Sequence, residues 1–123
     1  MAKKQYTIIE SSGNLDAYSE YDLIESPAIV SLKNVENKGL ICVGAWAKYL
    51  TTDNIGNEIT CISLQDANTG ETFSGQSSTF RESFDDIVDR VSDMEEVPEM
   101  FFIEVLHRTS KSGRDYINCA LIS

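Results

Sequence analysis

The arrangement of apolar and polar residues along the chain predicts a series of short strands. Over residues 58–66 the pattern alternates, with Ile59 and Cys61 on one face of a strand and Ile62 and Leu64 on the other. Further strands are predicted over residues 40–51, 71–76, 99–108 and 115–122. Gly44 lies inside the longest of them, and a glycine in a strand interior is typical of a bulge or a sharp bend.

The period changes to that of a helix between the third and the fourth of these strands. Apolar residues recur there at helical spacing, at Phe80, Phe84, Ile87, Val88 and Val91. Thr79, with Glu82 three residues later, has the pattern of a capping box, so the helix is expected to begin there.

Three strands, one helix and two strands in this order predict a mainly β fold, a five-stranded OB-like Greek-key barrel. An open α+β sheet with one covering helix uses the same elements and is the alternative fold. The residues before the barrel are harder to interpret, with short extended segments expected at 6–10 and 28–32. We therefore divide the chain into an N-terminal extension or arm, residues 1–38, and a barrel domain, residues 39–123.

Composition fits one ordinary core, because 41% of the 123 residues are hydrophobic. No apolar run approaches the roughly 20 residues that a membrane span needs, and no secretory signal follows Met1. We therefore expect no membrane partner and a location in the cytoplasm. Cys42, Cys61 and Cys119 lie far apart in apolar runs, so buried thiols are expected rather than a disulfide, a metal site or a cofactor.

The net charge of −10 argues at first against a nucleic-acid partner. The charge is unevenly placed, however. Residues 79–98 hold seven acids and two bases, whereas residues 99–123 hold three of each. The last two strands are joined by a polar turn that carries Lys111, Gly113 and Arg114. A basic hairpin with aromatic residues, on an otherwise acidic chain, is most simply explained by contact with nucleic acid.

Four short blocks of the chain share one resemblance. They are residues 31–37 (Ser-Leu-Lys-Asn-Val-Glu-Asn), residues 43–51 (Val-Gly-Ala-Trp-Ala-Lys-Tyr-Leu-Thr), the amphipathic helix, and residues 110–117 (Ser-Lys-Ser-Gly-Arg-Asp-Tyr-Ile). In this order they resemble the single-stranded DNA-binding proteins of small, protein-primed Bacillus phages and related Gram-positive phage and plasmid proteins. The resemblance implies an OB-like barrel that coats displaced single strands during replication. If a phage encodes the protein, the cytoplasm expected above is that of the host cell. Residues 1–30 have no counterpart and are a candidate oligomerisation arm.

Binding of a single strand needs flat side chains on which bases stack, and cations along the phosphate path. Trp46 and Lys48 share one face of their predicted strand, while Tyr49 takes the other. In the last hairpin, Tyr116 faces away from the apolar positions and has Arg114 beside it. The predicted nucleic-acid-binding residues are Trp46, Lys48, Phe73, Arg108, Lys111, Arg114 and Tyr116. A place in the core is the alternative for Trp46 and Phe73, and an ordinary solvated turn is the alternative for the hairpin.

No group of residues suggests an enzyme. His107 is the single histidine, without a nucleophile or paired cysteines around it, so a structural or solvated role is expected. The acids of the helix do not follow the spacing of a calcium-binding loop and are expected to form a solvated face.

The sequence thus predicts a sequence-independent single-stranded DNA-binding protein that acts in phage or plasmid DNA replication or transfer. Because cations are few, useful coating would require self-association along the strand, and replication proteins are further candidate partners. An acidic protein-interaction module that imitates nucleic acid and occupies a host protein is the alternative.

Overall fold

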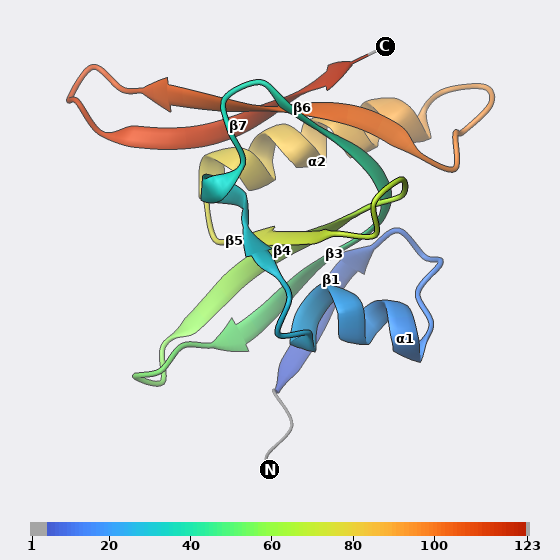
Figure 1. The fold of residues 1–123 in the computed structure, drawn as a ribbon, viewed down its shortest axis with the longest axis horizontal. Helices are drawn as coiled ribbons and strands as arrows, with labels where there is room; N and C mark the ends of the chain where they lie inside the picture. Colours follow the sequence, from blue (N-terminus) through green and yellow to red (C-terminus); the bar gives the residue numbers. More distant parts are fainter. Residues whose placement is uncertain (1–4, 123) are drawn as a thin grey trace.

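Strand β3 (Gly39–Thr52) is the longest element and organises the sheet (Figure 1). The computed structural model describes residues 5–122. One edge of β3 pairs with β4 (Glu58–Asp66). The other edge is shared by β6 (Phe101–Thr109), opposite residues 39–43, and β1 (Tyr6–Ser11), opposite residues 47–51. With β2 (Val30–Ser31), β5 (Thr72–Gly75) and β7 (Asp115–Ile122), the sheet order is β2-β5-β4-β3-β6-β7.

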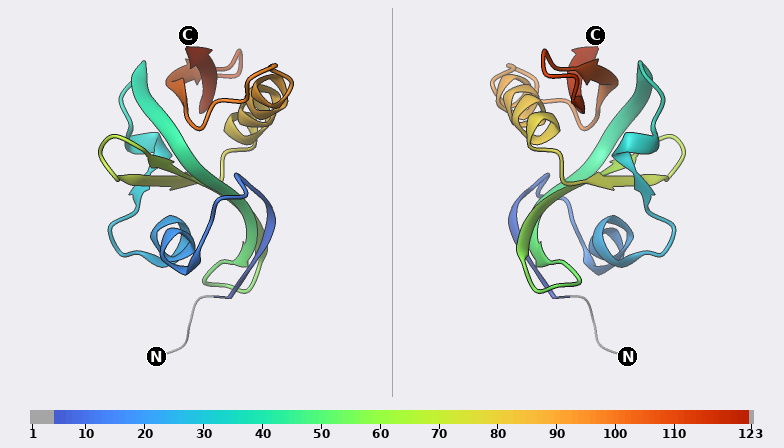
Figure 2. Two further views of the ribbon diagram at one scale, coloured as in Figure 1. Left: turned by 90° about the vertical axis from the view of Figure 1, so that its right-hand side faces the viewer. Right: turned by 90° about the vertical axis from the view of Figure 1, so that its left-hand side faces the viewer.

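The helical elements lie on opposite sides of β3 (Figure 2). Helix α2 (Ser78–Ser92) packs against the inner face of the curled sheet. A short helix α1 (Ala17–Glu20) and the π-helical turn η1 (Tyr21–Glu25) cover the outer face. A 3-10 turn, η2 (Leu32–Asn34), leads toward β3.

Strands β3 and β4 therefore separate two apolar cores. The inner core contains Ile62 and Leu64 together with the helix residues Phe80 and Phe84. The outer core contains Cys61 and, packed against it, Ile59, together with Leu23 of η1. This arrangement confirms the predicted alternation in β4 and explains why both of its faces are apolar.

The bend in β3 occurs at Gly44, as predicted. The register with β4 shifts between Val43 and Ala45, and a Cβ atom on Gly44 would lie 2.9 Å from the Cβ atom of Ala67. The carboxylate of Asp66 holds this corner. Its Oδ2 accepts from the backbone N–H of Cys42 at 3.0 Å, and its Oδ1 accepts from the N–H groups of the next turn at 2.8 and 3.0 Å. Burial acts to raise the pKa of Asp66, but the backbone donors outweigh it and the pKa is lowered.

On the free edge of β7, two backbone groups form hydrogen bonds with hydroxyl groups of α2 and its N-cap. Thr79 Oγ1 donates to the carbonyl oxygen of Ile117 at 2.7 Å, and Ser77 Oγ lies 3.3 Å from the same oxygen. Ser83 Oγ accepts from the N–H of Cys119 at 3.1 Å. Helix α2 thus stands where a β5–β7 ladder would close a barrel, and β5 pairs instead with β2 in parallel.

The mainly β class is confirmed, and all five predicted strands and the helix are present. The sheet is a strongly curled half-barrel, a shape compatible with an OB-like barrel. It also contains β1 and β2, from the predicted N-terminal extension, which pair with β3 and β5. The division at residues 38 and 39 stays a prediction; residues 1–4 and Ser123 lie outside the described residues.

One boundary was predicted wrongly. The helix begins at Ser78, with Ser77 as its N-cap, because the Ser77 hydroxyl accepts from the N–H of Phe80 at 3.2 Å. Thr79 is therefore inside the helix, and its hydroxyl serves β7 instead of a capping box. The three cysteines are free and buried, as predicted, and burial raises the pKa of the Cys119 thiol to about 11.

We predict that Asp66→Asn lowers the free energy of unfolding by about 2 kcal/mol at pH 7, because an amide cannot replace the charge-assisted bonds to backbone N–H groups. The lowered pKa means that the carboxylate stabilises the fold above the unfolded-state pKa of about 3.9, and that this contribution is lost as pH falls through the folded-state pKa. Urea titrations should therefore show a difference between the two proteins that shrinks on acidification. The exposed Glu58→Gln serves as the control, and an equal loss in both variants would contradict the role of Asp66.

Candidate nucleic-acid interface

The β6–β7 hairpin presents its basic residues on a well-defined turn. The N–H of Ser110 donates to the carbonyl oxygen of Arg114 at 2.9 Å, and the N–H of Arg114 donates back to Ser110 Oγ at 3.1 Å. Gly113 allows this turn, because its φ of +83° lies in the left-handed region. Arg108 and Tyr116 are a direct cross-strand pair, so their side chains leave the same face of the hairpin.

Residues 33–38 are attached to this hairpin. His107 Nε2 lies 2.6 Å from the carbonyl oxygen of Val35, and the N–H of His107 donates to Asn37 Oδ1 at 2.9 Å. A carbonyl oxygen can only accept, so Nε2 of His107 carries a proton. The N–H of Lys38 donates to the carbonyl oxygen of Val105 at 2.7 Å. His107 thus has a structural role, and it brings Lys33 and its neighbours beside the hairpin.

A groove runs along the gap between β5 and β7, and we call it the seam groove. It consists of two adjoining hollows, of about 200 and 620 Å³, that share Lys33 and Ile117. The smaller hollow is also lined by His107, Asp115 and Tyr116. The larger one continues past β5 to the β3–β4 turn, with Ser31, Asn54, Ser74, Gln76 and Ser77 among its lining residues. Figure 1 shows the hairpin tip and the β3–β4 turn on the same side of the molecule, with β5 and η2 between them.

The positive charge of the protein is concentrated at the hairpin end of the seam groove. Residues 33–38 and 104–115 hold five cations against three acids, a net charge of +2 in a chain whose total is −10, which leaves −12 for the rest. Lys33, Lys38, Arg108, Lys111 and Arg114 form no ion pair with any residue that the structure describes. These cations are free to contact an anionic ligand.

Two of the predicted site residues lie elsewhere, and their prediction was wrong. Trp46 is 6% exposed and packs edge-on against Phe84 of α2, with ring centroids 5.4 Å apart. Lys48 lies between two carboxylates, at 3.2 Å from Asp85 Oδ1 and 3.6 Å from Glu10 Oε2. Trp46 and Lys48 do share one face of β3, as predicted, but α2 covers that face. Neither side chain is available to a nucleic acid.

Phe73 also belongs to the core. It lies opposite Leu64 in the β4–β5 register, and cross-strand partners point to the same face of a sheet. Because Leu64 is fully buried in the inner core, Phe73 points inward and packs against it, half-buried. The structure therefore brings together four of the seven predicted residues, namely Arg108, Lys111, Arg114 and Tyr116.

Sequence reasoning missed Lys33 and Asn54. Lys33 lies in a 3-10 turn without a periodic pattern, and the signal for it was its place in the first of the four blocks described above. Asn54 lies in a turn that reaches the groove only through the tertiary fold.

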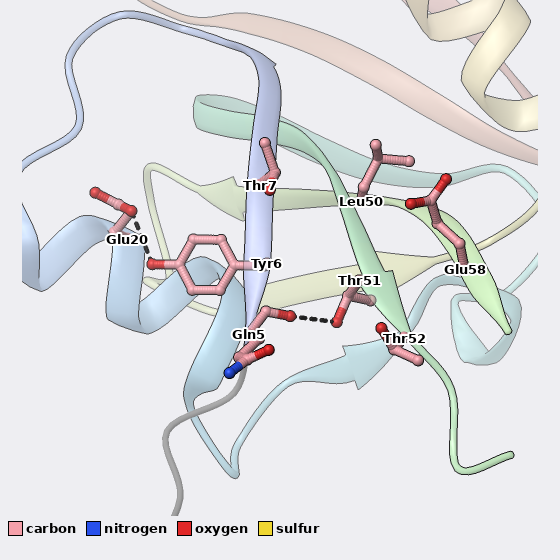
Figure 3. A pocket seen from close by; sticks show the side chains of 8 residues that line it. All are labelled: Gln5, Tyr6, Thr7, Glu20, Leu50, Thr51, Thr52 and Glu58. Carbon is pink, nitrogen blue, oxygen red and sulfur yellow. Dashed lines mark hydrogen bonds between the residues drawn. The ribbon is translucent and has the colours of Figure 1, made fainter. Parts of the chain in front are cut away.

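A further hollow, at the ends of β1 and β3, has a different character (Figure 3). Its lining includes Glu20 and Glu58 and contains no lysine or arginine among the described residues. Tyr6 OH donates to Glu20 Oε1 at 2.7 Å, and burial together with this carboxylate raises the pKa of Tyr6 to about 12. The hollow is thus acidic, and its most prominent donor is already engaged, so it does not suit a phosphate group.

Within residues 5–122, no three His, Cys, Asp or Glu side chains are grouped so that they could hold a metal ion. The described helices also include none with the length and apolar character needed to cross a membrane.

Comparison with known proteins adds no relative. No protein-family model, no curated protein and no solved structure matches this chain.

We predict that Trp46 is shielded from acrylamide in the native protein and becomes accessible in urea, because α2 covers its ring. Stern–Volmer titration of its fluorescence, with and without denaturant, measures this difference. The peptide Lys-Trp-Lys gives the value for a fully exposed indole. Native quenching equal to that of the peptide would contradict the buried position.

Proposed function

We propose that this protein binds single-stranded DNA without sequence preference, through the seam groove and the β6–β7 hairpin. The observation that carries the proposal is that Lys33 and Tyr116 line the seam groove, while the adjoining hairpin carries Arg108, Lys111 and Arg114 without ion pairs among the described residues. Cations along a groove and an aromatic side chain for base stacking are the two requirements of sequence-tolerant single-strand binding.

The position of the groove also supports an OB-like classification. OB-folds bind oligonucleotides with the face of their second and third strands and with the loops that follow the first and fourth strands. The corresponding elements here are β4 and β5, the β3–β4 turn, and the hairpin turn at residues 110–114. The seam groove extends from the β3–β4 turn at Asn54 to Asp115, the residue that follows the hairpin turn. The resemblance described above is the support for a role in phage or plasmid DNA replication or transfer.

Each part of the interface has a distinct task in this proposal. Tyr116 is half-buried against the hairpin, so its ring is held in place for a base to stack on. Arg108, its cross-strand partner, adds a cation–π contribution and contacts a phosphate. Lys33 and the hairpin cations contact further phosphates, while Asn54 and Gln76 offer neutral hydrogen bonds along the groove.

The charge distribution limits the affinity. The −12 carried by the rest of the chain repels a nucleic acid and confines contact to the hairpin end. Four phosphate contacts give a slope of about −3 for the logarithm of the binding constant against the logarithm of the salt concentration, at about 0.7 per contact for a single strand. One protomer therefore binds weakly at physiological salt, and self-association along the strand would be needed for continuous coating.

We predict that Tyr116→Ala weakens binding to oligo-dT by about tenfold or more, since stacking of one base contributes about 1–3 kcal/mol. Fluorescence anisotropy of labelled oligo-dT at low salt measures the loss. Tyr18→Ala is the matched control, because Tyr18 is an exposed tyrosine on α1, remote from the groove. Equal effects of the two substitutions would remove Tyr116 from the interface.

We predict that Arg108→Gln and Arg114→Gln together reduce the steepness of the salt dependence by about two contacts, from about −3 to about −1.5. The same anisotropy titration, repeated over a range of salt concentrations, gives the slope. Arg90→Gln, an exposed arginine of α2, should leave the slope unchanged. Wild-type binding that does not respond to salt would refute the phosphate contacts altogether.

A further inference from the structure

The end of β6 opposite to the hairpin tip carries a surface of the opposite charge. Residues 93–100, which we call the acidic loop, connect α2 to β6 and contain four acids and no base. Three of their apolar side chains are exposed nonetheless: Met94 at 43%, Val97 at 61% and Met100 at 45%. Exposed apolar side chains that are grouped together and rimmed by polar residues are typical of an interaction surface.

The acidic loop forms one wall of a groove of about 720 Å³. On this side its apolar lining includes Val88 and Val91 of α2 and Val97, Pro98 and Met100 of the loop. The opposite wall is the region of β3 around Gly44 and the end of β1. The groove exists because β1 and β6 pair with separate parts of the same edge of β3, which leaves residues 44–46 between them.

The backbone at this gap is already satisfied. The Asn14 side-chain amide donates to the carbonyl oxygen of Gly44 at 3.2 Å, and the N–H of Ser12 donates to the carbonyl oxygen of Trp46 at 3.0 Å. A partner therefore cannot add a strand at this edge by pairing with β3. What the groove offers is apolar side-chain surface within a negatively charged rim.

The acidic residues around the groove favour a positively charged partner. Residues 82–100 hold eight acids and one base, Arg90, which does not line the groove. Glu10 and Glu99 line it directly, and Glu95 and Glu96 lie in the loop beside them. Lys48 partly neutralises Glu10, whereas Glu95, Glu96 and Glu99 have no ion pair with another described residue. A nucleic acid is repelled by this rim, and a positively charged ligand is attracted.

We propose that this groove binds a basic amphipathic segment of another protein. The apolar side chains of the segment occupy the groove, and its lysines and arginines contact Glu95, Glu96 and Glu99. The basic hairpin tip of a second copy does not fit this description, since residues 109–114, Thr-Ser-Lys-Ser-Gly-Arg, include no large apolar side chain. The site is separate from the proposed nucleic-acid interface, because the two lie at opposite ends of β6 (Figure 1).

The test is fluorescence anisotropy with a labelled amphipathic helical peptide of leucine and lysine, added to the full chain at low salt without nucleic acid. Val97→Ser with Met100→Ser should weaken binding by about tenfold, since buried apolar anchors dominate such contacts. Ile55→Ser is the apolar control, an exposed side chain in the β3–β4 turn. The double variant Glu95→Gln with Glu99→Gln should also weaken binding. Its control is Glu58→Gln with Glu71→Gln, which removes the same number of charges at exposed sites elsewhere.

A second peptide, with serine in place of leucine, separates the groove from plain charge attraction. The proposal requires that it bind at least about tenfold more weakly than the leucine peptide. Equal binding of the two peptides, or equal losses in the loop variants and in their controls, would overturn the proposal. Because nucleic acid is absent, these outcomes do not depend on whether the seam groove binds DNA.

Discussion

The corner of β3 at Gly44, held by the carboxylate of Asp66, is the constraint on which the rest of the structure depends. Strand β3 has 14 residues and pairs with two different strands along one edge. The bend turns residues 39–43 toward β6 and leaves residues 47–51 to β1. It therefore produces the half-barrel that holds α2, and also the gap that becomes the apolar groove. One buried carboxylate connects the backbone of β3 just before the bend, at Cys42, with the backbone of the turn that follows β4, at Asn68 and Thr69.

Much of the fold was predictable because its strongest signals are local. A few consecutive residues are enough to predict each of three features: the alternation in β4, the apolar face of α2 and the bend at Gly44. The candidate site was less predictable because it depends on which faces of the sheet the helices cover. Alternation places Trp46 and Lys48 on one face of β3, but it does not say that α2 packs on that face. Lys33 lies beside the hairpin because residues 35–38 bond to β6, for example where His107 bonds to the carbonyl oxygen of Val35, a contact between residues 72 positions apart. The hairpin residues could be proposed from the sequence because their turn, their charge and their alternation all lie within one short segment.

Strand β6 connects two surfaces of opposite character. Its last residues lead into a basic turn beside the seam groove, and its first residues follow an acidic loop with exposed apolar side chains. The segments at the two ends of β6 thus carry charges of opposite sign. In a field of this kind, an anionic polymer and a cationic protein segment would each be guided to a different end. The net charge of −10 does not show this difference between the two ends of β6.

The hydroxyl groups that α2 offers to β7 have a consequence for solubility. The sequence of β7, with Tyr116-Ile-Asn-Cys-Ala-Leu-Ile, is apolar and rich in residues that favour strands, and an open edge of this kind is a template for other chains to add to. Thr79 and Ser83 occupy the groups in the middle of that edge, at Ile117 and Cys119, so an incoming strand finds them taken. Helix α2 in this way protects the protein against aggregation with two side chains and leaves the half-barrel open.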